Sequence, residues 1–332
     1  MQIKKIWVTW ETQRRNQSLS NALGAQLYEL DFNNLPSFLR YIKCSACTLV
    51  ILYREKPQTL FVQNPSLILA TLAIAITKIS KINVVIDAHN GGIKPLDGKS
   101  KFLNSWARFI LKNSPTTIVT NEAIRHKIRQ YTTDTEILVL PDPLPAIHTP
   151  ARKMLLKGKF NLLFICTWAT DEPYLNVIEA AKLTDRDVFI YITGNHRKIQ
   201  GLDPSKLPAN IVLTGFIPSK EFDHLLYSAD AIMDLTTRED CLVCGAYEAI
   251  SIEKPLILSK TQALQSYFPG MIYTNNQADD IAQCIEAMLS NLNKFNEKAA
   301  ALKHEITAKW AQQLNEVENK LLNSQIKLKT LN

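Results

Sequence analysis

Short apolar runs that alternate with helical patterns constrain the fold of this sequence more than any other feature. In the first half, runs rich in β-branched residues predict strands at 5–10, 48–53, 59–63, 83–87, 116–120 and 136–140. Helical patterns lie between them at 18–29, 34–43, 66–80, 101–113 and 121–131. Strands and helices that alternate in this way are typical of a parallel sheet covered by helices. We therefore expect an α/β fold.

The same alternation starts again after a proline-rich segment. Residues 141–150, PDPLPAIHTP, contain four prolines, which exclude regular structure. Beyond them, strands are expected at 161–167, 188–193, 211–214, 231–235, 255–259 and 271–273, with helices near 172–183, 219–228, 242–252, 261–267 and 278–290. The prediction is two Rossmann-like domains, 1–145 and 159–293, joined by a linker at 146–158. The carboxyl ends of their strands should face a central cleft, where such folds bind ligands.

The C-terminal segment, 294–332, has a helical pattern with one apolar stripe. Trp310, Leu314, Val317 and Leu321 recur at the spacing of one helix face. Such a stripe must pack on something, and we expect it to pack on the N-terminal domain. An exposed helix or a dimer contact is the alternative.

Composition limits the class of protein. With 332 residues, 46% hydrophobic and 21% charged, the chain has room for two domains with ordinary cores. No signal-peptide pattern begins the sequence, and the apolar stretch at 67–76 is shorter than the ~20 residues that cross a bilayer. We expect a cytoplasmic protein.

The six cysteines predict neither a disulfide framework nor a metal site. Cys44-x2-Cys47 and Cys241-x2-Cys244 have the spacing of zinc half-sites, but they lie far apart in the sequence and among apolar neighbours. Free thiols are the expected state, and we expect no metal.

Positive charge is concentrated in the first half. Residues 1–150 hold 18 Lys and Arg against 10 Asp and Glu, which leaves 20 against 21 for residues 151–332. Nucleic acid, an acidic membrane surface and a phosphorylated acceptor all fit a basic half, and so does a solvated basic face. The segment 101–114 places Phe102, Trp106 and Phe109 among basic residues, as in an interfacial helix, although core packing also explains it.

The segment 234–259, DLTTREDCLVCGAYEAISIEKPLILS, is the most informative stretch. A strand ends near Leu235, a polar loop follows, and a helix is expected to begin near Leu242. The N–H groups of a helix start can hold a diphosphate without a basic side chain. Asp240 precedes that start and Glu248 lies two turns further on. These carboxylates could hold the hydroxyls of a sugar and of a ribose.

This segment resembles the E-x7-E region of group 1 glycosyltransferases, which have the GT-B fold and the pattern E-G-F-G-L-x-x-x-E-A-M-A-x-G-K-P. Asp240 takes the place of the first Glu and Glu248 that of the second, while Lys254 and Pro255 close the match. The resemblance implies a nucleotide-sugar donor site in which Cys241 and Leu242 contribute to the phosphate contact.

Three other segments resemble the same family in order and spacing, and together the likeness covers about residues 160–290. LTGFIPSKEFDHLLYSADAIMDL at 213–235 implies that Phe216 and Ile217 meet the nucleotide base. FIYITGN at 189–195 implies a donor loop at Gly194 and Asn195, and the strand and helix at 161–183 imply a contact at Thr167.

The sequence also departs from the family. Where its members often carry Arg and Lys after the first strand of the second domain, this chain has Asp171 and Glu172. The donor charge must then be met by Arg197, by Arg238 or by the helix start. Glu239 could replace Asp240, whose side chain is shorter than that of glutamate.

In the first half, the strand 83–87 is followed by HNGG. Similar transferases carry catalytic or acceptor groups on this loop, which makes Asp87 and His89 the candidates. Asp87 would be the general base of an inverting reaction, and His89 would steady the donor in a retaining one. A structural Asp and His pair is the alternative. Arg14 and Arg15 follow the first strand and could meet an acceptor phosphate, or form a solvated pair at a helix start.

The resemblance implies a hexosyltransferase that moves a sugar from a UDP or GDP donor to a glycan or a polyprenyl-diphosphate-linked acceptor. Surface polysaccharide assembly at the inner face of the plasma membrane, with peripheral contact to anionic lipid, would fit it. We expect no nucleic-acid partner. Two alternatives stay open: a sugar-nucleotide epimerase of similar layout, and a non-catalytic nucleotide-sugar or nucleic-acid binding protein. A nicotinamide dehydrogenase is disfavoured because no G-x-G-x-x-G follows either first strand.

Overall fold

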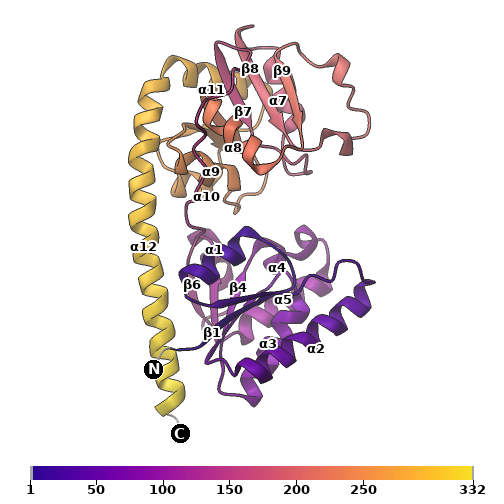
Figure 1. Ribbon diagram of the computed structural model, residues 1–332, viewed down its shortest axis with the longest axis vertical. Coiled ribbons are helices and arrows are strands. Elements are labelled where there is room, and N and C mark those ends of the chain that lie inside the picture. The colour runs from indigo at the N-terminus through magenta and orange to yellow at the C-terminus, as the bar shows by residue number, and fades with distance from the viewer. Residues whose placement is uncertain (1–2, 331–332) are drawn as a thin grey trace. The chain divides into compact units, whose positions relative to one another are not determined.

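The computed structural model describes residues 3–330, and the chain divides into two compact units (Figure 1). Unit 1 runs to Pro143 and also takes in the segment from Lys309 onward, while unit 2 is Leu144–Ala308. Residues 1, 2, 331 and 332 of the predicted domains lie outside the described residues. No helix between residues 3 and 330 is both long enough and apolar enough to span a bilayer.

Unit 1 contains a fully parallel sheet with the strand order β2-β1-β3-β4-β5-β6. Its strands are β1 (Lys5–Thr9), β2 (Gln26–Glu29), β3 (Thr59–Gln63), β4 (Asn83–Ala88), β5 (Thr116–Val119) and β6 (Glu136–Val139). Its helices are α1 (Arg14–Ala22), α2 (Ser37–Glu55), α3 (Leu67–Ile79), α4 (Asn90–Ile93), a 3-10 turn η1 (Pro95–Gly98), α5 (Lys101–Asn113) and α6 (Glu122–Arg129).

Two predictions in this unit are wrong. The expected strand at 48–53 is the second half of α2, and β2 lies where the end of a helix at 18–29 was predicted. An apolar run of six residues fits a buried strand and a helix equally well, so its periodicity could not decide between them. The helix ends only at Lys56, which takes a left-handed φ of 44°.

The two faces of this sheet have separate cores. Alternate strand residues such as Ile6 and Val8 pack against α2, α3 and α5. Trp7 and Phe61 point the other way, where α1 packs together with the segment from Lys309 onward. The predicted stripe therefore packs on the N-terminal sheet: Val317 and Leu321 are buried in that core, with Trp310 and Leu314 against it.

Unit 2 has a second fully parallel sheet, with the order β12-β11-β10-β7-β8-β9. All six strands lie where the sequence predicts them: β7 (Phe160–Phe164), β8 (Val188–Thr193), β9 (Ile211–Gly215), β10 (Ala231–Asp234), β11 (Leu256–Ser259) and β12 (Ile272–Thr274). The helical elements are α7 (Tyr174–Ala181), η2 (His196–Lys198), η3 (Pro204–Lys206), α8 (Ser219–Ser228), α9 (Cys244–Ser251), α10 (Gln262–Tyr267), α11 (Ala278–Ser290) and α12 (Leu292–Thr330).

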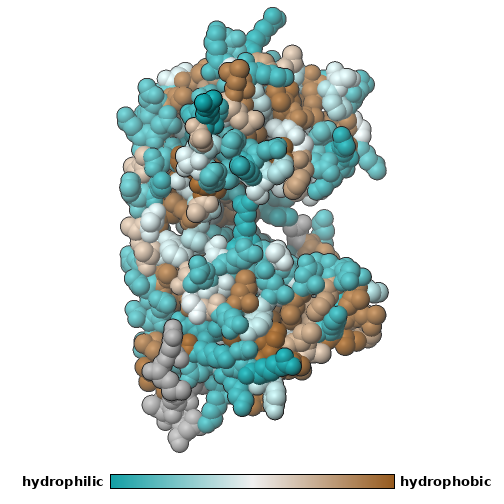
Figure 2. All heavy atoms as spheres, in the orientation of Figure 1, coloured by the Kyte–Doolittle hydropathy of each residue, from teal (hydrophilic) through white to brown (hydrophobic). Residues whose placement is uncertain are grey.

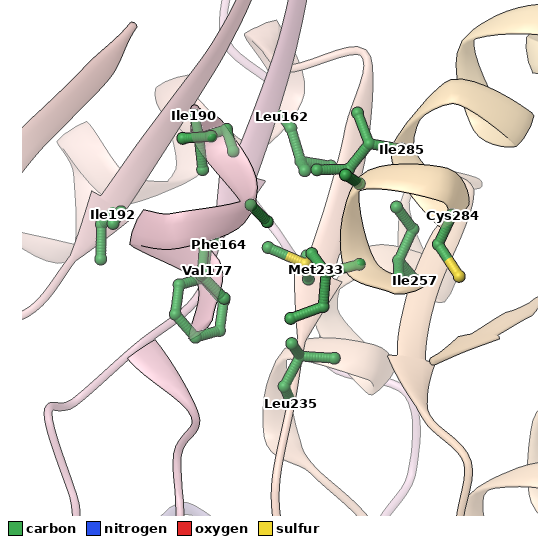
Figure 3. Packing of buried hydrophobic residues seen from close by; sticks show 14 of the residues in the cluster. Leu162, Phe164, Val177, Ile190, Ile192, Met233, Leu235, Ile257, Cys284 and Ile285 are labelled. Atoms are coloured by element: carbon green, nitrogen blue, oxygen red, sulfur yellow. The ribbon is translucent and has the colours of Figure 1, made fainter. Parts of the chain in front are cut away.

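The helices α7 and α11 cover one face of this sheet. Figure 3 shows the packing: Val177 of α7 and Ile285 of α11 contact side chains of the central strands, among them Phe164 and Met233. The opposite face packs against α8, α9, α10 and the first part of α12. Because both faces are covered, the central strands are mostly apolar and buried, as in other parallel sheets.

The order of the strands locates the ligand-binding edge of each sheet. In unit 2 the chain passes from β7 to β8 and β9 on one side, then returns to place β10 on the other side of β7. In unit 1 it passes from β1 to β2, then places β3 on the other side of β1. In open α/β sheets, ligands bind at the carboxyl ends of the strands where the order reverses.

Candidate functional site

The loops after β7, β8 and β10 leave the same edge of the unit 2 sheet. They carry the predicted donor residues Thr167, Gly194, Asn195, Arg238 and Asp240. The chain is closely packed here. At Gly194, φ is +84°, and a Cβ atom would come within 2.3 Å of the carbonyl oxygen of Cys166. Only glycine fits that position, so the loop after β8 can approach the loop after β7.

A glutamate occupies the centre of the loop after β7. The carboxylate of Glu172 accepts hydrogen bonds from the backbone N–H groups of Thr167, at 2.9 and 3.1 Å, and of Ala169, at 2.9 Å. The hydroxyl of Thr167 donates a further bond at 2.9 Å. Backbone N–H groups that converge on one point form a binding concavity for an anion. In this chain the anion bound there is the protein's own carboxylate.

The backbone of that loop is strained. Trp168 has a φ of +64°, which is unusual for a bulky residue, and its side chain is buried. Its indole N–H donates to the carbonyl oxygen of Thr193 at 2.8 Å, and its ring packs against Tyr174 at 4.9 Å. Backbone strain of this kind persists where the surrounding structure holds it, often at functional sites.

Asp171 joins this loop to the loop after β10. Its carboxylate accepts a hydrogen bond from the hydroxyl of Thr236 at 2.9 Å, and its backbone carbonyl accepts one from the N–H of Thr237 at 2.7 Å. The guanidinium of Arg238 lies 3.5 Å from the same carboxylate, with its side chain about half exposed. Arg238 is thus held at the edge and still reaches solvent.

The start of α9 is held by a buried carboxylate that the sequence analysis did not single out. The N–H of Gly245 donates to Asp234 at 2.8 Å, and the helix begins at Cys244 rather than at Leu242. Burial raises the pKa of Asp234 well above its ordinary value. The charges of Glu172, Glu248 and Asp171 raise this pKa further, against the opposing effect of the bond from Gly245. A strand-end aspartate is the only sequence signal that could have indicated it.

Glu248 is nearly buried, with 7% of its surface exposed. Its position on α9 places its charge close enough to Asp234 to affect that pKa. Any ribose contact would therefore have to use the small part of Glu248 that remains exposed. The sequence predicted the helix and the spacing correctly but did not predict this burial.

The other predicted donor residues differ in exposure. Phe216 is 86% exposed and so presents a free aromatic ring, while Ile217 packs against the core. Arg197, Asn195, Thr167 and Glu239 are exposed, whereas Asp240, Cys241 and Leu242 are half-buried. Burial raises the pKa of Cys241 to about 11, so its thiol stays protonated at neutral pH.

The predicted residues of unit 1 meet at the corresponding edge of their own sheet. Asp87 is fully buried and binds Arg15 through three contacts, the shortest 2.7 Å long. Burial alone would raise the pKa of Asp87, but the charges of Arg15 and His89 outweigh it and lower this pKa. Arg15 also donates to Asp142 at 2.8 Å.

These contacts give Asp87 and His89 different surroundings. His89 Nε2 lies 3.0 Å from Asp87 Oδ2 and 3.0 Å from Gln63 Nε2, and 21% of its side chain is exposed. Asp87 has no exposed surface, so a direct base role would require Arg15 or His89 to move away. The buried Arg15 likewise has its donors occupied within the protein, while Arg14 is exposed. Gln63 was missed because a single strand-end amide has no sequence signature.

Three solved structures to which this chain is similar share its fold. Anabaena HepE in complex with UDP-glucose superposes with a TM-score of 0.74, covering 96% of this chain and 99% of that one at 12% identity. Sucrose-phosphate synthase from Thermosynechococcus elongatus gives 0.71, with 90% and 84% covered at 13% identity. The chain has the GT-B fold. A glycosyltransferase from Rickettsia africae ESF-5 shares it, with a TM-score of 0.66, 96% and 99% covered, and 13% identity. No family model and no curated protein matches the sequence.

The GT-B assignment agrees with one backbone detail of the E-x7-E-like segment. Glu253 has a φ of +61°, in the left-handed region that favours glycine. It stands where the glycosyltransferase pattern has its glycine, directly before Lys254 and Pro255. The chain therefore has a left-handed turn at this position, with a glutamate where the pattern has glycine.

Proposed function

We propose that this protein transfers a sugar from a nucleotide diphosphate donor, UDP- or GDP-linked, to a glycan or polyprenyl-diphosphate-linked acceptor. The observation that carries the proposal is the position of the E-x7-E-like helix α9. It begins beside the strand β10, at the edge where the strand order reverses, and the loops after β7 and β8 leave the same edge. Exposed side chains from these loops lie at that edge, beside backbone N–H groups that bind carboxylates of the protein itself.

In this proposal the diphosphate is bound by backbone N–H groups and by Arg238 and Arg197. The Glu172 carboxylate already accepts from the amides of Thr167 and Ala169, so these groups have the geometry to bind an anion. Arg238 adds a half-exposed positive charge beside Asp171. The helix start and these cations together would supply the positive charge that Arg and Lys of the family pattern supply to the diphosphate.

The nucleoside and the sugar are assigned to flanking residues. Phe216 is exposed and can stack on the base, and Glu248 would accept the ribose hydroxyls through its exposed part. Asp240, with Glu239 beside it, would hold the donor sugar. The donor is expected to resemble that of HepE, whose solved complex contains UDP-glucose.

The unit 1 network supports a role for His89 beside the acceptor or the donor sugar. Asp87 holds the Nε2 side of the ring, and no hydrogen bond to Nδ1 exists among residues 3–330. Asp87 would then act through His89, as a positioning residue, and Arg15 would fix Asp87. Arg14 is left as the exposed candidate for an acceptor phosphate. A place in surface polysaccharide assembly at the cytoplasmic membrane face belongs to the same proposal.

A panel of UDP-, GDP-, ADP- and TDP-sugars in a thermal unfolding assay tests the donor. A ligand at a hundred times its dissociation constant adds about 2.7 kcal/mol to the free energy of unfolding. We expect a UDP- or GDP-sugar to raise the unfolding temperature and to release nucleoside diphosphate when an acceptor is added. If no sugar nucleotide shifts the transition, the donor assignment is wrong. Epimerised sugar formed without any acceptor would favour the epimerase instead.

A further inference from the structure

The helix α2 has its apolar side facing solvent. Only Cys44, Thr48 and Leu52 of its 19 residues are buried, and they form its contact with the sheet core. Part of that contact is polar, since the indole N–H of Trp10 donates to the Thr48 hydroxyl at 3.1 Å. A surface helix normally turns its apolar stripe inward, and this one does not.

The outward face of α2 carries a continuous apolar arc. At 3.6 residues per turn, its large side chains occupy about 120° of the helix circumference without a polar residue between them. They are Phe38, Leu39, Ile42, Leu49, Val50 and Tyr53, each between 48% and 79% exposed. In Figure 2, hydrophobic residues gather on the part of the molecule where Figure 1 draws α2. Contiguous exposed apolar surface of this kind marks an interaction site.

The charge around this arc is almost entirely positive. Around the helix circumference, Lys43 and Arg54 lie next to one border of the arc. No acidic residue occurs between Asp31 and Glu55 in the sequence. The helices of this face of the sheet, α2, α3 and α5, together carry seven Lys and Arg against one Glu. That one, Glu55, is paired with Lys4 at 2.6 Å. The layer is therefore complementary to an anionic surface.

We propose that the α2 arc docks on the surface of an anionic membrane, with its apolar side chains in the interfacial layer and Lys43 and Arg54 against the lipid headgroups. An apolar helix face bordered by Lys and Arg is the form that binds in the plane of a membrane. A second copy of the same face would bring like charges together. On α5, which packs against α3 on the same face of the sheet, Phe102 is 73% and Phe109 49% exposed, and the helix also carries Lys101, Arg108 and Lys112.

This inference deepens the membrane placement within the proposed function, but its test is separate from the sugar transfer, because the arc lies in unit 1 and vesicle binding requires no donor. The experiment is co-sedimentation of the full chain with vesicles of phosphatidylcholine, with and without phosphatidylglycerol. We expect binding to the anionic vesicles that weakens with salt, and little binding to the neutral ones.

Two double variants separate the apolar from the electrostatic contribution. Ile42→Gln with Leu49→Gln should lower the vesicle partition coefficient at least ~10-fold, because two inserted side chains are lost. Lys43→Gln with Arg54→Gln should lower it about fivefold per charge, on anionic vesicles only. The matched control, Leu183→Gln with Leu289→Gln, changes two leucines of similar exposure in unit 2 and should bind like the wild type.

Circular dichroism and the thermal transition show that each variant remains folded, as expected for exposed positions. The proposal is overturned if the wild type binds neither vesicle, or if the arc variant binds as tightly as the control. It is also overturned if the wild type is a dimer by sedimentation velocity, Ile42→Gln with Leu49→Gln makes it a monomer, and vesicles are not bound. The arc would then be a self-association surface.

Discussion

Both sheets are fully parallel, but the edges where their strand orders reverse differ in their electrostatics. At the edge of unit 1, a buried carboxylate, Asp87, is matched by a buried cation, Arg15, at 2.7 Å. At the edge of unit 2, the charges of Asp171, Glu172 and Glu248 all act on the pKa of Asp234, and the guanidinium of Arg238 lies 3.5 Å from the carboxylate of Asp171. The pKa values of the buried aspartates reflect this, since that of Asp87 is lowered and that of Asp234 is raised.

The difference indicates what each edge can do. A satisfied ion pair fixes a side chain in place, so the Arg15 and Asp87 pair can orient His89 but offers no free charge to a ligand. Backbone N–H groups that bind a protein carboxylate have the geometry to bind another anion, as the loop after β7 does with Glu172. We infer that unit 1 orients the side chain of His89 and that unit 2 binds the anionic ligand. Four substitutions test that contrast.

Breaking the ion pair of unit 1 should have the largest effect. Asp87→Asn removes the buried one of the two carboxylates that pair with Arg15 and leaves only the partly exposed Asp142, which should cost about 3 kcal/mol of unfolding free energy by urea titration. Because the pKa of Asp87 is lowered in the folded protein, its stabilisation is present above the ordinary Asp pKa and is lost as pH falls below it. The free energy of unfolding should therefore fall less steeply at acidic pH in the variant than in the wild type. Asp134→Asn, on the exposed surface of the same unit, should change neither.

The second effect is on donor binding at unit 2. If Glu248 accepts from the ribose as proposed, Glu248→Gln should weaken that charge-assisted hydrogen bond, and donor affinity by calorimetry should fall about tenfold or more. Glu253→Gln, two residues after the end of the same helix and paired with Lys303, serves as the matched control. Equal affinities for both variants would remove Glu248 from the proposed site.

A smaller change, in the opposite direction, is expected at Glu172. Glu172→Gln keeps an oxygen that can accept from the amides of Thr167 and Ala169 but removes a negative charge from the place proposed for the diphosphate. At close range in water, one charge contributes on the order of 1 kcal/mol, so the donor should bind about fivefold tighter. Glu179→Gln on α7 is the control. Weaker binding would mean that Glu172 supports the donor loop rather than competes with the donor.

The smallest expected change is in the pH dependence of stability. The raised pKa of Asp234 means that the folded protein holds a proton that the unfolded chain releases, so stability falls as pH rises above the ordinary Asp pKa. Asp234→Asn can still accept from the N–H of Gly245 and should reduce this fall. Thermal unfolding across a pH series measures it, and unchanged profiles would show that Asp234 is ionised in the folded state.

Much of the fold could be predicted from the sequence, because strand and helix patterns alternate clearly in unit 2. The failures lie where an apolar run had two explanations. Residues 48–53 were predicted as a strand because their side chains are apolar, but on α2 Leu49, Val50 and Tyr53 face solvent. A rule that places apolar residues inside cannot anticipate a helix whose apolar face points outward.

The candidate site was predictable in position but not in its internal contacts. Strand-end residues such as Asp87, His89 and Asp240 follow from topology, since parallel strands end at one edge. The bonds from Gly245 to Asp234 and from Thr167 to Glu172 depend on how loops distant in sequence approach each other. Whether Arg15 faces solvent or Asp87 depends on the same packing, and residue type alone does not encode it.

The long helix α12 affects the order in which the two units can fold during synthesis. Val317 and Leu321, near its end, belong to the core of the sheet that the ribosome makes first. Domains generally fold in the order of their synthesis. Here the core of unit 1 includes residues that are synthesised after all of unit 2. Unit 1 can therefore complete its core only after unit 2 has been synthesised.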